Sequence, residues 1–165
     1  MEYVPALARW LHFMAGVMWI GLLYYFNFVQ ADAMKAAQAD GTAAGITKHV
    51  APRALLYFRW SAVVTWLAGA TLLGINFFNA FFFRDAAFYA IGVGAWLGTI
   101  MLFNVWVLIW PNQKKILGIV QATDEQKNKA RRVAFLASRT NTMLSIPMLF
   151  FMGAGASAHL SIFFG

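Results

Sequence analysis

The sequence contains no cysteine. A chain without cysteine forms no disulfide and offers no thiolate to a metal, so iron–sulfur clusters are excluded. It also lacks the C-x-x-C-H motif that attaches a c-type haem covalently, and a c-type haem is excluded for the same reason. Charge is scarce too: 12% of the 165 residues are charged, against roughly a quarter in an ordinary soluble domain.

Hydrophobic residues take the place of the missing charges. They make up 61% of the chain, and the mean hydropathy is +0.62. Four blocks reach the length of about 20 residues that a helix needs to cross the hydrocarbon core: 4–29, 54–78, 86–110 and 133–159. We therefore predict an all-α integral membrane protein, a four-transmembrane-helix antiparallel bundle in the lipid bilayer. Residues 1–165 form its single membrane domain, without an internal repeat.

The basic residues are distributed unevenly between the blocks. The net charge is +7, but the cations lie in loops rather than on a nucleic-acid-binding face, so no nucleic-acid partner is expected. Three Lys and Arg lie in the loop 30–53 and six in the loop 111–132, while Arg84 stands in the connection on the opposite side. The positive-inside rule then places both loops in the cytoplasm and both termini in the periplasm of a bacterial inner membrane. Pro111 is expected to end the third helix.

A histidine and an arginine stand near the start of the first block. Arg9 and His12 lie in its outer third, and the fourth block returns to that side near His159. Gly16 follows His12 by one helical turn and leaves room for a flat ligand. Helix bundles bind haem iron through such histidines, so His12 and His159 are candidate ligands of haem b. Arg9 is a candidate partner for the haem propionates, or it extends to lipid phosphate.

A second group of polar residues lies toward the other end of the blocks. It consists of Arg59, Asn104, Arg139 and Asn141. All six acidic residues lie outside the four blocks, so the two arginines have no carboxylate partner at their depth. This arrangement is typical of a site for an anion, a quinone headgroup or a lipid phosphate. Alternatively, the arginines simply reach the cytoplasmic water.

Four stretches resemble a known family when they are taken in order. They are "RWLHFMAGVMWIGLLYYFNF", "LLYFRWSAVVTWLAGATLL", "NVWVLIWPNQKKI" and "SRTNTMLSIPMLFFM". Together they are similar to the N-terminal membrane domain of the bacterial membrane-bound urate oxidases, also called urate hydroxylases. In that family a periplasmic cytochrome c domain often follows, and these 165 residues contain none. The first helix also has a weaker likeness to the haem-containing membrane protoporphyrinogen oxidases.

The chain departs from this family pattern in the last block. Arg139 stands in "SRTN" where the family has histidine, whereas Asn141 is retained. The family's terminal "SNH" is stretched here to "GAGASAH", which makes His159 a displaced equivalent of the family histidine.

Three functions follow from these observations. The first is a small membrane redox subunit that binds haem b, with quinone as a further candidate ligand, and passes electrons to other membrane subunits or a periplasmic cytochrome. The second is a haem-free accessory subunit of a larger membrane complex. The third is a urate-oxidase-like membrane enzyme in which Arg59 and Arg139 clamp the anion. The first is our prediction by a narrow margin, and whether the chain is an enzyme is left open.

Overall fold

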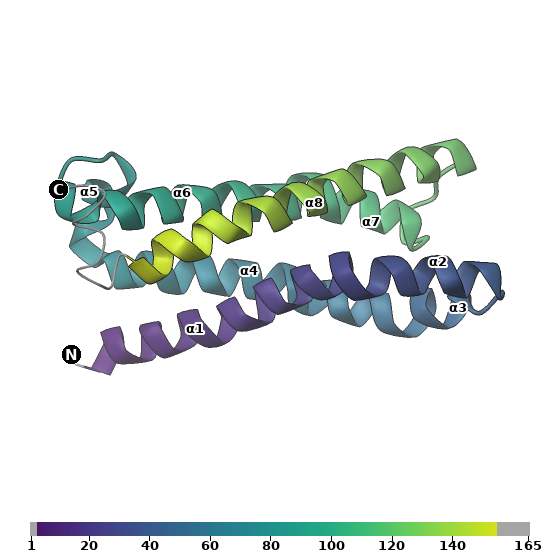
Figure 1. The fold of residues 1–165 in the computed structure, drawn as a ribbon, viewed down its shortest axis with the longest axis horizontal. Helices are drawn as coiled ribbons and strands as arrows, with labels where there is room; N and C mark the ends of the chain where they lie inside the picture. The colour runs from purple at the N-terminus through teal and green to yellow at the C-terminus, as the bar shows by residue number, and fades with distance from the viewer. Residues whose placement is uncertain (1–2, 155–165) are drawn as a thin grey trace.

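The structure is a computed structural model that describes residues 3–154, and within this range the chain is helical with no strand. Four long helical runs lie alongside one another in alternating directions (Figure 1). The first run contains α1 (Tyr3–Tyr24), η1 (Tyr25–Gln30) and α2 (Ala31–Ala39), and the second contains α3 (Ala43–Gly45), η2 (Ile46–Val50), α4 (Ala51–Leu73), η3 (Gly74–Asn76) and α5 (Phe77–Phe81). The third contains η4 (Ala86–Phe88), α6 (Tyr89–Phe103), η5 (Asn104–Ile109) and α7 (Trp110–Ile116), and the fourth is α8 (Asp124–Ala154).

Three of the four runs are long and apolar enough to cross a membrane. They are Tyr3–Ala39, Ala43–Phe81 and Ala86–Ile116, and they identify an all-α membrane protein. The run α8 is not among them, although it has 31 residues. Its first turns are charged and its middle is polar, with Asn141 and Ser145 fully buried against the other helices. The predicted count of four membrane spans is therefore not confirmed. The helix α8 is long enough to cross a membrane, but its hydropathy is lower than that of the other three runs.

Two helix ends test the local sequence signals. Thr123 and Gln126 form a reciprocal capping box before α8, because each backbone N–H donates to the other's side-chain oxygen, at 3.0 and 3.2 Å. Pro111, in contrast, does not end the third helix, and that prediction was wrong. The helical run continues without a break from η5 into α7, and Pro111 lies in the first turn of α7.

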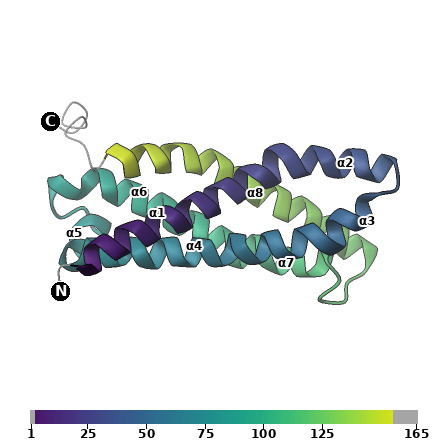
Figure 2. The same ribbon diagram turned by 90° about the horizontal axis from the view of Figure 1, so that it is seen from below.

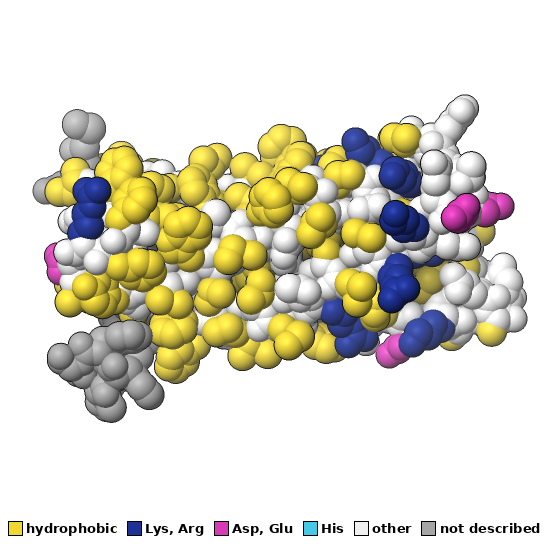
Figure 3. All heavy atoms as spheres, turned by 90° about the horizontal axis from the view of Figure 1, so that it is seen from above, with side chains coloured by type: hydrophobic (Ala, Val, Ile, Leu, Met, Phe, Trp, Pro, Cys, Tyr) yellow, Lys and Arg dark blue, Asp and Glu magenta, His cyan; other side chains and the backbone are white. Residues whose placement is uncertain are grey.

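The cations gather at one end of the bundle (Figure 3). We call this the cationic end; it contains α2, α3 and α7 and the first turns of α8. At the other end, called here the α5 end, α1 begins, α8 ends and Arg84 follows α5. A broad apolar surface separates the two ends, as expected for a protein in a bilayer. The assignment of the cationic end to the cytoplasm stays a prediction.

The bundle consists of two hairpins that run in the same direction. In the first, α1 packs on α4, and in the second, α6 packs on α8. The first helix of each hairpin carries the pattern W-x-G-x4-F-N, formed by Trp19, Gly21, Phe26 and Asn27 and by Trp96, Gly98, Phe103 and Asn104. A π-helical segment, η1 or η5, includes each asparagine. The expectation of no internal repeat was therefore wrong for this motif, which is short and lies in apolar sequence.

Candidate ligand cavity and polar layer

His12 is held in one orientation by a backbone carbonyl. Its side chain is half-buried on α1, and its Nδ1 lies 2.8 Å from the carbonyl oxygen of Thr65 on α4. Because a carbonyl can only accept a hydrogen bond, Nδ1 carries the proton and donates it. A neutral imidazole in this tautomer presents the lone pair of Nε2 on its other side. In the described residues, Nε2 has no hydrogen-bond partner.

Gly69 makes room for the imidazole ring. A Cβ atom at this position would lie 2.9 Å from Cε1 of His12 and 3.1 Å from Nδ1, closer than real contacts allow. A Cβ at Gly16 would only touch the Thr65 methyl group, at 3.8 Å. The glycine that fits His12 closely is therefore Gly69 on the neighbouring helix, rather than Gly16 on its own helix.

A cavity of about 410 Å³ lies beside His12, between the two hairpins. Its walls come from α1, α4, α5, α6 and α8. At this end of the bundle α8 stands away from α1 in both ribbon views (Figure 2). Phe13 and Val17 line the cavity yet are largely exposed on α1, so the cavity opens on the lipid-facing side. Its volume is within the usual range for small-molecule sites.

Nearly all of the cavity wall is apolar, and its few polar or polarisable groups are distinctive. Trp19 is 2% exposed, and its indole N–H is buried without a hydrogen-bond partner. Thr65 uses its hydroxyl on the carbonyl of Ser61, so it offers no free donor. Met148 and Met152 contribute the thioethers of α8. A buried unpaired N–H is costly, which makes Trp19 a candidate contact for a ligand oxygen.

Two residues of the predicted polar group, Asn104 and Asn141, are hydrogen-bonded to each other. Asn104 Nδ2 donates to Asn141 Oδ1 at 2.8 Å, and Asn141 Nδ2 donates to the Met101 carbonyl at 3.0 Å. Asn27 Nδ2 donates to Ser138 Oγ at 2.7 Å in the first hairpin's equivalent position. Asn141 is fully buried. These bonds join α8 to η5 within the second hairpin and to η1 of the first hairpin, which supports a role in helix packing.

The arginines of the predicted anion site are not brought together. Arg59 lies over the Trp110 ring, with its guanidinium carbon 3.9 Å from the ring centroid. Arg139 is exposed on α8 and lies over Phe135 at 5.0 Å. Arg9 is exposed on α1, one helical turn before His12. Arg59 and Arg139 thus contact separate aromatic rings on separate elements.

The second predicted haem ligand, His159, lies outside the described residues. His49 is exposed near the cationic end, whereas the cavity lies toward the α5 end. Residues 3–154 contain no group of three or more His, Cys, Asp or Glu able to hold a metal ion.

Sequence reasoning singled out His12 as a candidate ligand but did not identify the groups that position its ring. Thr65 contributes only its backbone carbonyl, and no side-chain pattern reveals such a role. Gly69 belongs to an ordinary small-residue segment of α4. Trp19 was visible as a mid-block tryptophan seven residues after His12, but its missing hydrogen bond appears only in three dimensions.

The comparisons with known proteins agree with the resemblance in the sequence. The family model described as "Urate oxidase N-terminal" matches residues 1–89 and 76–165, which together span the chain. The overlap of these two segments falls at the junction between the two hairpins. No curated protein and no solved structure gives a significant match. The chain is a membrane protein that belongs to the urate oxidase N-terminal family.

Proposed function

We propose that this protein is a small membrane redox subunit that holds haem b through His12. The observation that carries the proposal is the 2.8 Å hydrogen bond from His12 Nδ1 to the Thr65 carbonyl. Histidines that bind metal are commonly oriented in this way, because a hydrogen bond at one ring nitrogen directs the other toward the metal. It leaves the lone pair of His12 Nε2 free, and this atom would hold the haem iron.

The surrounding residues fit a flat, apolar group. The cavity is wide and lined by hydrocarbon and aromatic surface, and Gly16 adds no side chain to its wall. Arg9, which is exposed on α1 at the α5 end, would pair with the propionates. His159 is the candidate second ligand, and the thioethers of Met148 and Met152 on α8 are alternatives. Bound haem would supply one-electron transfer, and a periplasmic cytochrome or another membrane subunit would exchange electrons with it.

A quinone is the second candidate for this cavity, and Trp19 favours it. A quinone is apolar and planar, and its carbonyl oxygen would accept a hydrogen bond from the unpaired Trp19 indole. His12 Nε2 would accept the hydroxyl proton of the reduced form. We therefore propose the α5 end for quinone rather than the position beside Asn104 and Asn141, whose amides already bond each other.

The family membership also supports a urate-oxidase-like activity, but the residues give that reading less support. A urate anion needs cationic or hydrogen-bonding groups that converge on one point. Arg59 and Arg139 contact different rings, and neither lines the cavity. A haem-free accessory subunit is the remaining alternative.

The test is the cofactor content of protein purified from haem-replete cells. We expect a Soret band and a b-type pyridine haemochrome near one equivalent, lost in His12→Ala. His49→Ala is the matched control, because His49 is an exposed histidine far from the cavity, and it should keep the haem. Solvent extraction of the same samples measures quinone. Folded wild-type protein without haem contradicts the proposal, and quinone lost from His12→Ala would then establish the second candidate.

A further inference from the structure

Two cations share one tryptophan ring near the cationic end. Arg59 of α4 lies 3.9 Å from the Trp110 ring centroid, and Lys114 Nζ of α7 lies 6.0 Å from the same centroid. All three side chains are half-buried. The two positive charges come from different helical runs, so the folded bundle, rather than local sequence, brings them together.

No protein carboxylate neutralises this pair. The ion pairs in residues 3–154 are Lys35–Asp32 and Lys127–Asp124, and neither involves Arg59 or Lys114. Between residues 43 and 116 the sequence has one acidic residue, Asp85, which lies at the α5 end. A cation within a membrane span is costly unless it is paired, and a cation–π contact satisfies none of its N–H donors. The pair therefore lacks an anion.

A third unpaired donor belongs to the same surface. Trp106 lies one helical turn before Trp110, and its indole N–H is buried without a hydrogen-bond partner. Trp60, next to Arg59, packs edge-on against Trp106 with 5.4 Å between the ring centroids. Guanidinium, ammonium and indole donors thus lie along one face of α4, η5 and α7, and the acceptors they need are absent from the described chain.

We propose that this cluster, formed by Arg59, Trp60, Trp106, Trp110 and Lys114, binds the phosphodiester of an anionic phospholipid. Phosphate oxygens accept from all three kinds of donor, and basic sites between helices near a membrane surface bind anionic headgroups. Trp60 is 52% exposed on the outside of the bundle, where lipid surrounds the helices. Tryptophan also prefers the headgroup level of a bilayer. These features favour a lipid over an anion dissolved in water.

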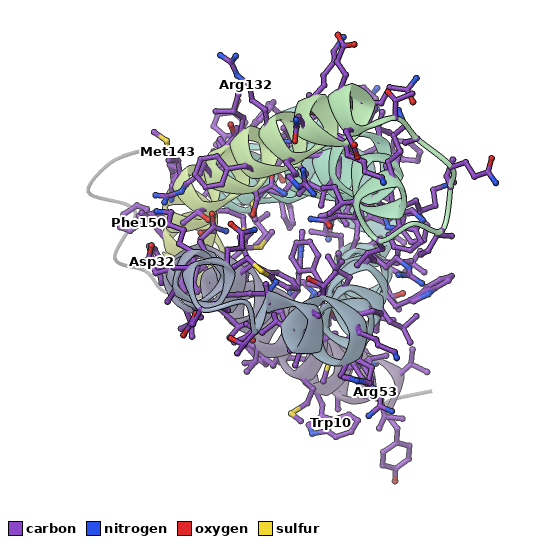
Figure 4. All side chains as sticks on the ribbon, turned by 90° about the vertical axis from the view of Figure 1, so that its right-hand side faces the viewer. Trp10, Asp32, Arg53, Arg132, Met143 and Phe150 are labelled. Atoms are coloured by element: carbon purple, nitrogen blue, oxygen red, sulfur yellow. The ribbon has the colours of Figure 1, made fainter. Side chains whose placement is uncertain are left out.

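The experiment measures which lipid the protein retains. Purified protein is equilibrated in mixed micelles with equal amounts of phosphatidylglycerol and phosphatidylcholine, washed, and analysed by native mass spectrometry. We expect phosphatidylglycerol to be enriched, and Arg59→Gln or Lys114→Gln to reduce the enrichment about fivefold each. Arg53→Gln is the matched control, since Arg53 lies on the same helix and points away from the bundle (Figure 4). It should leave the enrichment unchanged.

Further arms separate the alternatives. Arg59→Lys keeps the charge and should keep most of the enrichment, so it serves if Arg59→Gln fails to fold. Added inorganic phosphate at millimolar concentration should not displace the lipid. Equal retention of the two lipids, or an equal loss in Arg53→Gln and Lys114→Gln, overturns the proposal. Displacement by phosphate also overturns it, in favour of a soluble anion.

Discussion

The two hairpins carry the same motif but use it differently. In the second hairpin, the Trp96 indole N–H donates to the Phe81 carbonyl at 2.9 Å. In the first, the corresponding Trp19 indole is buried beside the cavity and has no partner. Seven residues before each tryptophan stands His12 in one hairpin and Tyr89 in the other. The tryptophan of the second hairpin is thus bonded to α5, whereas the tryptophan of the first hairpin is left without a partner beside the cavity.

Glycines account for part of this difference. In the second hairpin, Gly92 lies against the backbone of Ala80, and a Cβ at Gly94 would lie 3.2 Å from Met152. In the first hairpin, the close glycine is Gly69, and its neighbour is the His12 ring. Close packing at glycine therefore joins α6 to α5 and α8, whereas Gly69 of α4 makes room for the candidate ligand His12 on the facing helix.

The largest effect is expected from Gly92→Ala. A methyl group there would clash with the Ala80 carbonyl oxygen, which is backbone and cannot move without displacing α5. We expect a loss of about 3 kcal/mol in the free energy of unfolding. The first hairpin has Ala15 at the corresponding position, so Ala15→Gly should change stability by only about 1 kcal/mol. Denaturation in mild detergent measures both, and equal stabilities would contradict this account of the second hairpin.

The asparagine layer should give the next largest effect. Asn141→Ala leaves the Asn104 amide unpaired in a buried site and should cost about 1–3 kcal/mol. Asn27→Ala should cost less, because its partner Ser138 is only half-buried. A double-mutant cycle between Asn104 and Asn141 should give a coupling of about 1 kcal/mol. No coupling would mean that the two side chains do not bond in the membrane.

Gly69→Ala tests whether the space left by Gly69 determines the position of the His12 ring. The new methyl group should push the imidazole away from the Thr65 carbonyl and weaken retention of the cavity ligand about tenfold, with a small change in stability. Gly45→Ala is the control, because a Cβ at that helical glycine meets nothing within 4 Å. Ligand content per folded protein is the readout. Full retention in Gly69→Ala would show that the ring position does not determine binding.

Replacing Trp96 or Trp19 should change the free energy of unfolding least, and the two changes should have opposite signs. Trp96→Phe loses its bond to Phe81 and should cost about 1 kcal/mol. Trp19→Phe removes a buried unpaired donor, so the ligand-free protein should be as stable as before or slightly more stable. If Trp19→Phe is the more destabilising of the two, the indole has a partner that the comparison of the hairpins overlooks.

The sequence predicted the elements whose causes are local or compositional. Apolar blocks marked the three clear spans, and the lack of acids near Arg59 marked an unpaired cation. The prediction for Pro111 was wrong because the helix continues through this residue. The free-energy cost of a proline depends on its position in the folded helix, which the residue type alone does not give. Asn104 and Asn141 were placed at one depth, but only packing shows that they bond each other. Thr65 and Gly69 act through a carbonyl and an absent side chain, which leave no chemical signature in sequence.

Chemical rescue at His12 tests the central claim most directly. The reduced-minus-oxidised visible spectrum is recorded for wild type and for His12→Gly, with and without millimolar imidazole. We predict a b-type spectrum in wild type, its loss in His12→Gly, and its return when imidazole fills the space of the missing side chain. An unchanged spectrum in His12→Gly, or a folded wild-type protein without any haem spectrum, would contradict the account.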